Sequence, residues 1–297
     1  MLRQRHITTV ALMMSCLSLP AFAQSDTDAV KDTAAGYIVD KAQSFISDFA
    51  DSLKSDRIKV LEIDITEDNS QLGGEAKAVI GITETDRRFT FSQLSVIRRN
   101  KRTTANIGLG HRYITTDDTA VIGANIFADQ ETDAGHRRVS VGLEYLTLRG
   151  SLHLNHYMRQ SKTKDYKGVQ EKAMDGTDLK LAYRFDVPYQ PHISVRGFQW
   201  KGDGGYKASG QEIGVGVQLS KGVQLTAFHK DDNKNKADTR AMLRYSHYFG
   251  ADDSTTAENT GQSADARALR RLLYQPVERE NTIRKTQVKL GVIVTAD

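Results

Sequence analysis

The chain has 297 residues and a formal net charge of +4, and it contains 39% hydrophobic residues, 23 glycines, four prolines and one cysteine. It has no run of about 18 uninterrupted apolar residues, which excludes a helical membrane protein, and a single cysteine excludes an intrachain disulfide framework and a cysteine-based zinc site. The excess of 41 Lys and Arg over 37 Asp and Glu is too small and too evenly spread to indicate a nucleic-acid partner.

Residues 1–23 are predicted to be a secretory signal peptide. Two arginines precede an apolar run at 7–19, and Ala21 and Ala23 are the small residues that a signal peptidase needs before its cleavage site. Cleavage after Ala23 would also remove Cys16, the only cysteine of the chain. A lipoprotein acylated at Cys16 is the less favoured alternative, because Met13 stands where leucine is usual. The mature protein is expected outside the cytoplasm.

Residues 24–56 are predicted to form a periplasmic amphipathic helix. Between Asp28 and Lys54 the apolar residues recur every three or four positions, and charged residues occupy the other side. The polar face has no basic excess, so a helix docked on a larger body is favoured over a helix lying on a membrane surface. The apolar positions are Ile38, Ala42, Phe45, Ile46, Phe49 and Leu53.

From residue 57 to residue 249 the apolar period changes from 3.6 to 2, which predicts twelve antiparallel strands. Clusters of Gly, Asp, Asn and Lys separate them, and 161–176 is expected to be a long polar loop that contrasts with tight turns at the other end. The expected strands lie near 57–66, 75–85, 87–98, 102–114, 119–129, 137–147, 148–159, 177–186, 191–200, 209–219, 222–230 and 238–249.

The composition of the two strand faces distinguishes a soluble sandwich from a membrane barrel. One face holds glycines and long arginines, whereas the apolar face ends in aromatic residues, namely Tyr145, Tyr183, Trp200 and Phe249. Strands of about ten to twelve residues at roughly 3.3 Å each reach about 33–40 Å, the length of a tilted membrane strand. We therefore predict an all-β fold, a 12-stranded antiparallel β-barrel in the outer membrane of a Gram-negative bacterium.

The alternation assigns side chains to a wet lumen or to lipid. Ion pairing and solvation inside the barrel explain the lumenal charges better than catalysis does, whereas each such charge at the bilayer midplane would cost about 2–4 kcal/mol. The predicted lumen-facing residues are Glu144, His153, Asn155, Tyr157, Arg159, Lys180, Arg184, Arg240 and Arg244. The predicted lipid-facing residues are Val139, Val141, Leu143, Leu179, Leu181, Val215, Val217 and Leu243.

Three neighbouring segments resemble the inverse autotransporters typified by intimin and invasin. They are the glycine-punctuated segment 106–112 (NIGLGHR), the segment 123–130 (GANIFADQ) and the strand at 138–145, which ends in GLEY. The likeness extends over roughly residues 29–294. Leu146 departs from the family, in which a tryptophan often follows the Glu-Tyr pair.

The resemblance implies a barrel that precedes its exported passenger. In that family a linker after the twelfth strand forms a helix and then an extended segment that runs through the lumen to the cell surface. Here 264–274 is expected to be the helix, 274–281 resembles the linker, and 283–294 is expected to be extended. Residues 250–297 would thus form a linker helix and an extended C-terminal segment in the pore, although Pro276 departs from the family pattern.

No catalytic motif emerges, and the chain is expected to be neither an enzyme nor a protein that binds a cofactor or metal. His153 and His156 are three apart on a strand, so they point to opposite faces and cannot chelate one metal. The glycine-rich stretches 108–110 and 202–205 lack the strand–turn–helix context of a phosphate-binding loop.

The favoured function is a translocation and anchor unit for surface display or cell adhesion. The sequence ends soon after Ile283, so passenger domains are not expected. The alternative is a small, plugged, porin-like channel. The expected partners are outer-membrane lipid and lipopolysaccharide, the barrel-insertion machinery and periplasmic chaperones, with no nucleic acid; a host or cell-surface partner is left open.

Overall fold

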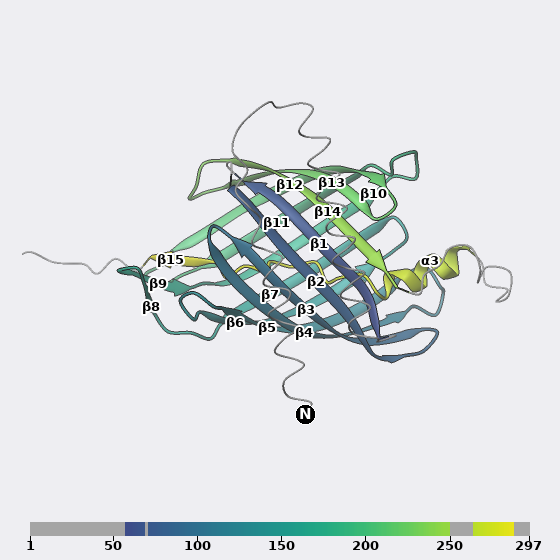
Figure 1. Ribbon diagram of the computed structural model, residues 1–297, viewed down its shortest axis with the longest axis horizontal. Helices are drawn as coiled ribbons and strands as arrows, with labels where there is room; N and C mark the ends of the chain where they lie inside the picture. Colours follow the sequence, from purple (N-terminus) through teal and green to yellow (C-terminus); the bar gives the residue numbers. More distant parts are fainter. Residues whose placement is uncertain (1–56, 69–70, 250–263, 288–297) are drawn as a thin grey trace, which may run out of the picture.

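Twelve antiparallel strands close into one barrel within the part of the chain that the computed structural model describes, residues 57–68, 71–249 and 264–287 (Figure 1). The predicted signal peptide and the predicted helix at 24–56 lie outside these residues. The barrel closes where the first strand pairs with the last, with Ile63 opposite Tyr245. The prediction of a 12-stranded antiparallel barrel is confirmed.

Each strand of the wall falls where the period-2 pattern placed it, with ends shifted by a few residues. The wall consists of β1 (Ile58–Asp68), β2 (Gln71–Glu84), β3 (Arg88–Arg99), β4 (Arg102–Ile114), β5 (Val121–Glu131), β6 (Arg137–Leu146), β7 (Gly150–Arg159), β10 (Asp175–Arg184), β11 (His192–Lys201), β12 (Lys207–Ser220), β13 (Val223–Asp232) and β14 (Asp238–Tyr248). The pattern is reliable here because every strand separates two different environments, one inside the barrel and one outside it.

The segment 161–176 is not the irregular polar loop that was expected. It holds two further strands, β8 (Lys164–Tyr166) and β9 (Val169–Ala173), which form a hairpin. The turn between them has positive φ angles at Lys167 (53°) and Gly168 (80°), as a tight hairpin turn of the mirror-image type requires. The prediction was wrong because these short strands are polar on both faces and carry no alternation.

The connections at the two ends of the barrel are less different than expected. At the end where β1 begins, the turns are 85–87, 115–120, 147–149, 185–191 and 221–222. At the opposite end, the connections 100–101, 132–136, 202–206 and 233–237 are equally short, and only 160–174 is long. The expected contrast therefore holds for one connection, the one that carries the β8–β9 hairpin.

One helix and one more strand follow the barrel in the described residues. Helix α3 (Ala264–Leu272) lies at the end where β14 finishes, and strand β15 (Lys285–Gln287) lies at the opposite end beside β9 (Figure 1). Neither α3 nor any other described helix is long and apolar enough to span a bilayer.

Inward-facing glycines make room for large rings inside the barrel. A Cβ atom at Gly108 would lie 2.3 Å from the Phe127 ring, and one at Gly110 would lie 2.3 Å from the Phe91 ring. Both phenylalanine side chains are fully buried and cannot swing into solvent. The glycines of the 106–112 segment are therefore explained by a steric requirement of the wall.

Replacing one of these glycines is expected to impair assembly. Gly108→Leu forces Phe127 out of its place, and overpacking of this kind typically costs about 1–3 kcal/mol. Heat-dependent gel mobility of the barrel measures the outcome as a lower yield of the folded species. Gly197→Leu is the matched control, because a Cβ atom there meets no atom within 4 Å; equal yields for the two variants would contradict the steric role.

Candidate functional site

The segment between α3 and β15, residues 273–284, runs through the interior of the barrel from one end to the other (Figure 1). We call it the linker. It enters beside α3 and leaves where the backbone N–H of Met174 donates a hydrogen bond of 2.9 Å to the carbonyl of Arg284. The linker and the wall that surrounds it form the candidate functional site.

Helix α3 closes the entrance of the barrel with its apolar face. Leu269 and Leu272 of the helix and Leu273 of the linker are buried against the inner wall, and the Tyr274 ring packs edge-on against Phe89 at 5.0 Å. Burying a leucine side chain contributes about 1.5–3 kcal/mol, so this contact holds the helix in place. The apolar cluster comprises Val60, Val79, Phe89, Phe91, Ile114, Val121, Phe127, Leu146, Leu269, Leu272, Leu273 and Val277.

Two wall side chains bind the first part of the linker through its backbone. Arg112 donates hydrogen bonds to the carbonyls of Leu273 (2.9 Å) and Gln275 (2.5 Å). The Gln93 side chain accepts a hydrogen bond of 2.7 Å from the N–H of Val277. An extended chain inside a barrel has no strand neighbour of its own, and buried backbone groups without partners are costly, so these side chains replace a missing strand.

The same backbone recognition continues towards the exit. The Tyr157 hydroxyl accepts a hydrogen bond of 2.7 Å from the N–H of Glu280, and Asn155 donates one of 3.1 Å to the carbonyl of Glu278. Arg138 donates to the carbonyls of Glu280 (2.5 Å) and Thr282 (3.0 Å). Five wall side chains thus bind backbone groups of the linker between Leu273 and Thr282.

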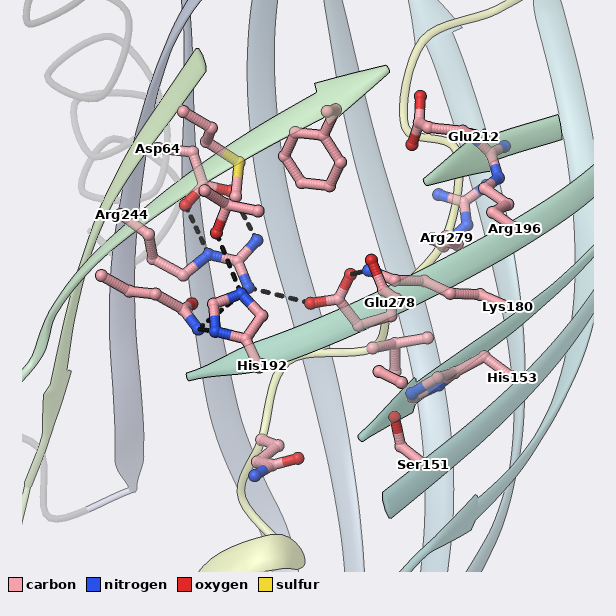
Figure 2. A pocket seen from close by; sticks show the side chains of 18 of the residues that line it. Asp64, Ser151, His153, Lys180, His192, Arg196, Glu212, Arg244, Glu278 and Arg279 are labelled. Carbon is pink, nitrogen blue, oxygen red and sulfur yellow. Dashed lines mark hydrogen bonds and ion pairs between the residues drawn. The ribbon is translucent and has the colours of Figure 1, made fainter. Parts of the chain in front are cut away.

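Glu278 is held between two cations of the wall. Its carboxylate accepts hydrogen bonds from Lys180 and Arg244, each at 2.9 Å, and Arg244 is itself paired with Asp64 at 2.7 Å (Figure 2). The three charged wall groups come from β1, β10 and β14. Glu278 therefore connects the first and the last strand of the wall with β10 through its ion pairs.

The next two linker residues alternate between opposite walls. Arg279 pairs with Asp129 at 2.7 Å, and Asp129 also accepts from Arg138 at 2.8 Å. Glu280 turns the other way and lies 3.3 Å from Arg196. This alternation of Glu278, Arg279 and Glu280 matches an extended backbone and fixes the register of the linker in the lumen.

The linker does not fill the whole lumen. A cavity of about 270 Å³ lies between the linker and the wall, and residues of β1 to β3, β7 and β10 to β14 line it. Lys180, Arg196 and His192 line it from the wall, and Glu278 and Arg279 line it from the linker (Figure 2). Charged side chains of both signs line the cavity beside apolar ones such as Leu146 and Phe228, so water and small ions fit it better than a wholly apolar ligand does. Among the residues that the structure describes, no three acidic, histidine or cysteine side chains form a metal-binding group.

A cluster of charges holds the chain where it leaves the barrel. Lys285 of β15 contacts Glu131 at 2.5 Å, and Arg102 bridges Glu131 and Glu171 of β9. His136 lies buried beside these groups, in the loop after β5, and burial lowers the pKa of its imidazole. The leaving chain pairs with β9 as strand β15, so that it adds a third strand to the β8–β9 hairpin.

Most of the residues predicted to face the lumen contact the linker, each other or inner-wall partners. The His153 ring lies 3.5 Å from Glu144, which holds Arg112, and Arg240 pairs with Glu212 at 2.6 Å. Arg159 lies at the exit, 2.7 Å from Asp203. Arg184 is exposed at the α3 end and donates a hydrogen bond to the carbonyl of Leu148.

The residues predicted to face lipid have the opposite parity to these lumenal neighbours. Val139, Val217 and Leu243 are partly buried, and the remaining five are exposed, namely Val141, Leu143, Leu179, Leu181 and Val215. Their contact with lipid stays a prediction.

Several residues that hold the linker were missed from the sequence. Arg112, Asp129, Arg138 and Arg196 all lie at inward positions of predicted strands, and the alternation alone could have placed them inside. They were not singled out because nothing in the sequence distinguishes a charge that binds the linker from a charge that pairs across the wall.

Replacing an outward apolar residue by a charge is expected to reduce the amount of assembled barrel. Leu143 is 58% exposed on the outer wall of β6, and an arginine at the bilayer midplane costs about 2–4 kcal/mol. Thr132→Arg, in an exposed loop, is the control. Unchanged yield and heat-dependent gel mobility for Leu143→Arg would contradict contact with lipid.

Comparisons with known proteins agree with this architecture. The inverse autotransporter β-domain family matches residues 14–281. A protein of Escherichia coli K12 named as an attaching and effacing protein homolog is 29% identical over 184 residues, which cover 61% of this chain and 61% of that protein. Intimin of Escherichia coli O127:H6 is 24% identical over 157 residues, which cover 52% of this chain and 16% of intimin.

A solved chain from work on the in-meso crystallization of membrane proteins has the same fold. It superposes with a TM-score of 0.67 and 20% sequence identity, covering 78% of this chain and 100% of that chain. The present chain spans less than two thirds of the length of the curated relatives, 61% of the attaching and effacing homolog and 16% of intimin. The family and the fold are those of outer-membrane barrels and adhesin anchors rather than of enzymes. The match over most of the sequence, together with the closed barrel, shows that the chain belongs to the inverse autotransporter β-domain family.

Proposed function

We propose that the barrel is a translocation and anchor unit that holds its own C-terminal segment in the lumen and presents the end of that segment at the cell surface. The observation that carries the proposal is the path of the linker, which enters beside α3, crosses the lumen and pairs as β15 with the β8–β9 hairpin. A barrel that served only as a pore would have no use for an ordered strand at its far end.

The manner of binding supports passage of a chain. Gln93, Arg112, Arg138, Asn155 and Tyr157 bind backbone groups of the linker. Every residue offers the same backbone groups, so these wall side chains can bind successive segments of a chain that moves through the lumen. The ion pairs at 278–280 then select one final register, because only the native sequence places opposite charges together.

The barrel then has one orientation in the outer membrane of a Gram-negative bacterium. The α3 end faces the periplasm, which the chain reaches after signal-peptide cleavage at Ala23, and the β15 end faces outward. Chaperones and the barrel-insertion machinery would act on the periplasmic side. Twelve extended residues of the linker reach about 40 Å, which exceeds a hydrocarbon thickness of about 30 Å.

An epitope tag placed after Asp297 tests the orientation and the threading together. Antibody is expected to bind the tag on intact cells without permeabilisation. The matched control carries the same tag between Asp117 and Asp118, in an exposed turn at the α3 end, and should bind antibody only after the outer membrane is opened. Binding after Asp297 only in permeabilised cells would defeat the proposal.

A plugged channel is the second candidate function. The cavity of about 270 Å³ beside the linker favours it, because water and small ions could occupy that space while the linker stays in place. The two functions differ in what removal of the linker does to the cell. Conductance is expected to rise in both cases, because the linker occupies the lumen in both. Only a translocation unit also loses surface display. Adhesion to a host or cell-surface partner is a further use of the displayed end that follows from the first function alone.

A further inference from the structure

One sector of the outer wall is buried, unlike the rest of it. On the outside of β4 to β12 most large apolar side chains are exposed, from 40% at Ile193 to 58% at Leu143, and others such as Val139 and Val217 are partly buried. Towards the α3 end of β1, β2, β13 and β14, several outward side chains are nearly inaccessible, with Leu61 at 3%, Ala78 at 1% and Tyr245 at 9%, whereas Leu72 at the far end of β2 is 59% exposed. We call this sector the seam patch; it comprises Ile58, Leu61, Ala78, Val223 and Tyr245, flanked by Ile63, Leu243 and Phe249.

The seam patch lies outside the barrel and not in the lumen. Leu61 stands next to Glu62, whose carboxylate pairs with the buried Lys77, and Tyr245 follows Arg244, which binds the linker. Successive strand residues point to opposite faces, so Leu61 and Tyr245 point outward. The patch spans the ladder between β1 and β14, which joins the two ends of the barrel wall.

The described elements that leave the wall do not account for this burial. Helix α3 packs its leucines against the inner cluster, the linker lies in the lumen, and the β8–β9–β15 sheet lies at the exit. The patch instead gathers at the α3 end, around the start of β1 at Ile58 and the start of β13 at Val223. Any segment that covers the patch has to reach this end of the barrel.

We propose that the segment 28–54 docks its apolar stripe on the seam patch and braces the junction between β1 and β14. This segment ends a few residues before Ile58, which is itself part of the patch, so it reaches the patch with no long connection. Its apolar residues, such as Phe45 and Phe49, recur on one face, and the patch offers a matching apolar surface. Its charged residues would face the periplasm and the lipid headgroups at this end of the barrel.

Engineered cysteines test the contact in the full chain. The only native cysteine is Cys16, in the predicted signal peptide, so the added thiols are the only ones expected in the mature protein. Phe45→Cys or Phe49→Cys is combined with Val223→Cys or Tyr245→Cys, and cells are treated with a short bismaleimide. We expect an intramolecular cross-link in at least one pair, seen as faster migration of the heat-denatured monomer because the link closes a large loop.

The control combines the same two helix positions with Leu181→Cys, on β10 at the opposite side of the barrel, where the side chain is 52% exposed. No intramolecular product is expected from it. Equal yields from Leu181→Cys, a product of dimer size only, or no product from any of the four seam pairs in assembled barrels would each overturn the proposal. The second of these outcomes would assign the patch to another copy of the chain.

A second measurement does not depend on cross-linking geometry. Phe45→Asp combined with Phe49→Asp should lower the temperature at which the barrel loses its folded gel mobility, whereas Asp48→Ala, on the polar face, should leave it unchanged. An identical transition in the double variant and the parent would overturn the bracing role. The accessibility of a tag after Asp297 does not enter this result, so the docking proposal and the proposed function fail independently.

Discussion

Deletion of residues 264–297 is expected to convert the barrel from a nearly closed state into an open channel. Helix α3 closes the entrance of the barrel with Leu269 and Leu272, and the linker occupies the lumen as far as β15. Without α3 and the linker, the cavity beside the linker joins the space that the linker occupied, and water fills the resulting channel. Planar-bilayer recordings of the purified protein should show large, stable conductance steps for the deletion and small or no steps for the full chain.

The deletion also removes part of the apolar cluster, so assembly has to be measured with conductance. Heat-dependent gel mobility reports whether the truncated barrel is closed. Leu269→Asp combined with Leu272→Asp is a milder variant that keeps the linker sequence. It should raise the frequency of channel openings, because it weakens only the apolar contact of α3 with the inner wall. Equal conductance of the assembled truncated barrel and the full chain would show that the linker is not what closes the pore.

Neutralising Asp129 is expected to be among the most destabilising single changes in the lumen. Its carboxylate is fully buried between Arg138 at 2.8 Å and Arg279 at 2.7 Å. Asp129→Asn leaves two buried guanidinium groups without their counterion, and breaking a buried pair in this way costs about 3–5 kcal/mol. The free energy of unfolding in lipid vesicles, followed by urea titration, measures the loss.

A matched carboxylate at the surface separates burial from charge. Asp86 pairs with Arg270 at 2.9 Å but its side chain is 85% exposed, so Asp86→Asn should change stability by about 0–1 kcal/mol at most. The double variant Asp129→Asn with Arg279→Met should cost less than the sum of the two single changes, because the orphaned charge on the linker is removed as well. Strict additivity would show that the linker and the wall are not coupled at this position.

Much of the wall could be predicted because its signal is local. Residues 139–145 alternate between apolar and small or charged side chains, and the structure places this stretch in β6 with that parity. The glycines at 108 and 110 could be noticed but not explained. Their reason is the rings of Phe127 and Phe91, which reach them from neighbouring strands.

The sequence by itself determined the twelve strands of the wall and the parity of most of their residues, because a strand between two environments repeats every two residues whatever its neighbours are. Trp200, predicted on the outward apolar face, is instead buried beside the lumenal Tyr157. The helix and the extended segment after the barrel were expected from the resemblance to intimin and invasin. Only the tertiary structure decided which charges hold the linker. Arg112 and Leu273 are distant in sequence, as are Asp129 and Arg279, and no local pattern specifies such pairs. The tertiary structure also decided that β8, β9 and β15 are strands. These short polar segments complete their backbone hydrogen bonds as one three-stranded sheet, which forms only when the leaving chain lies beside the hairpin.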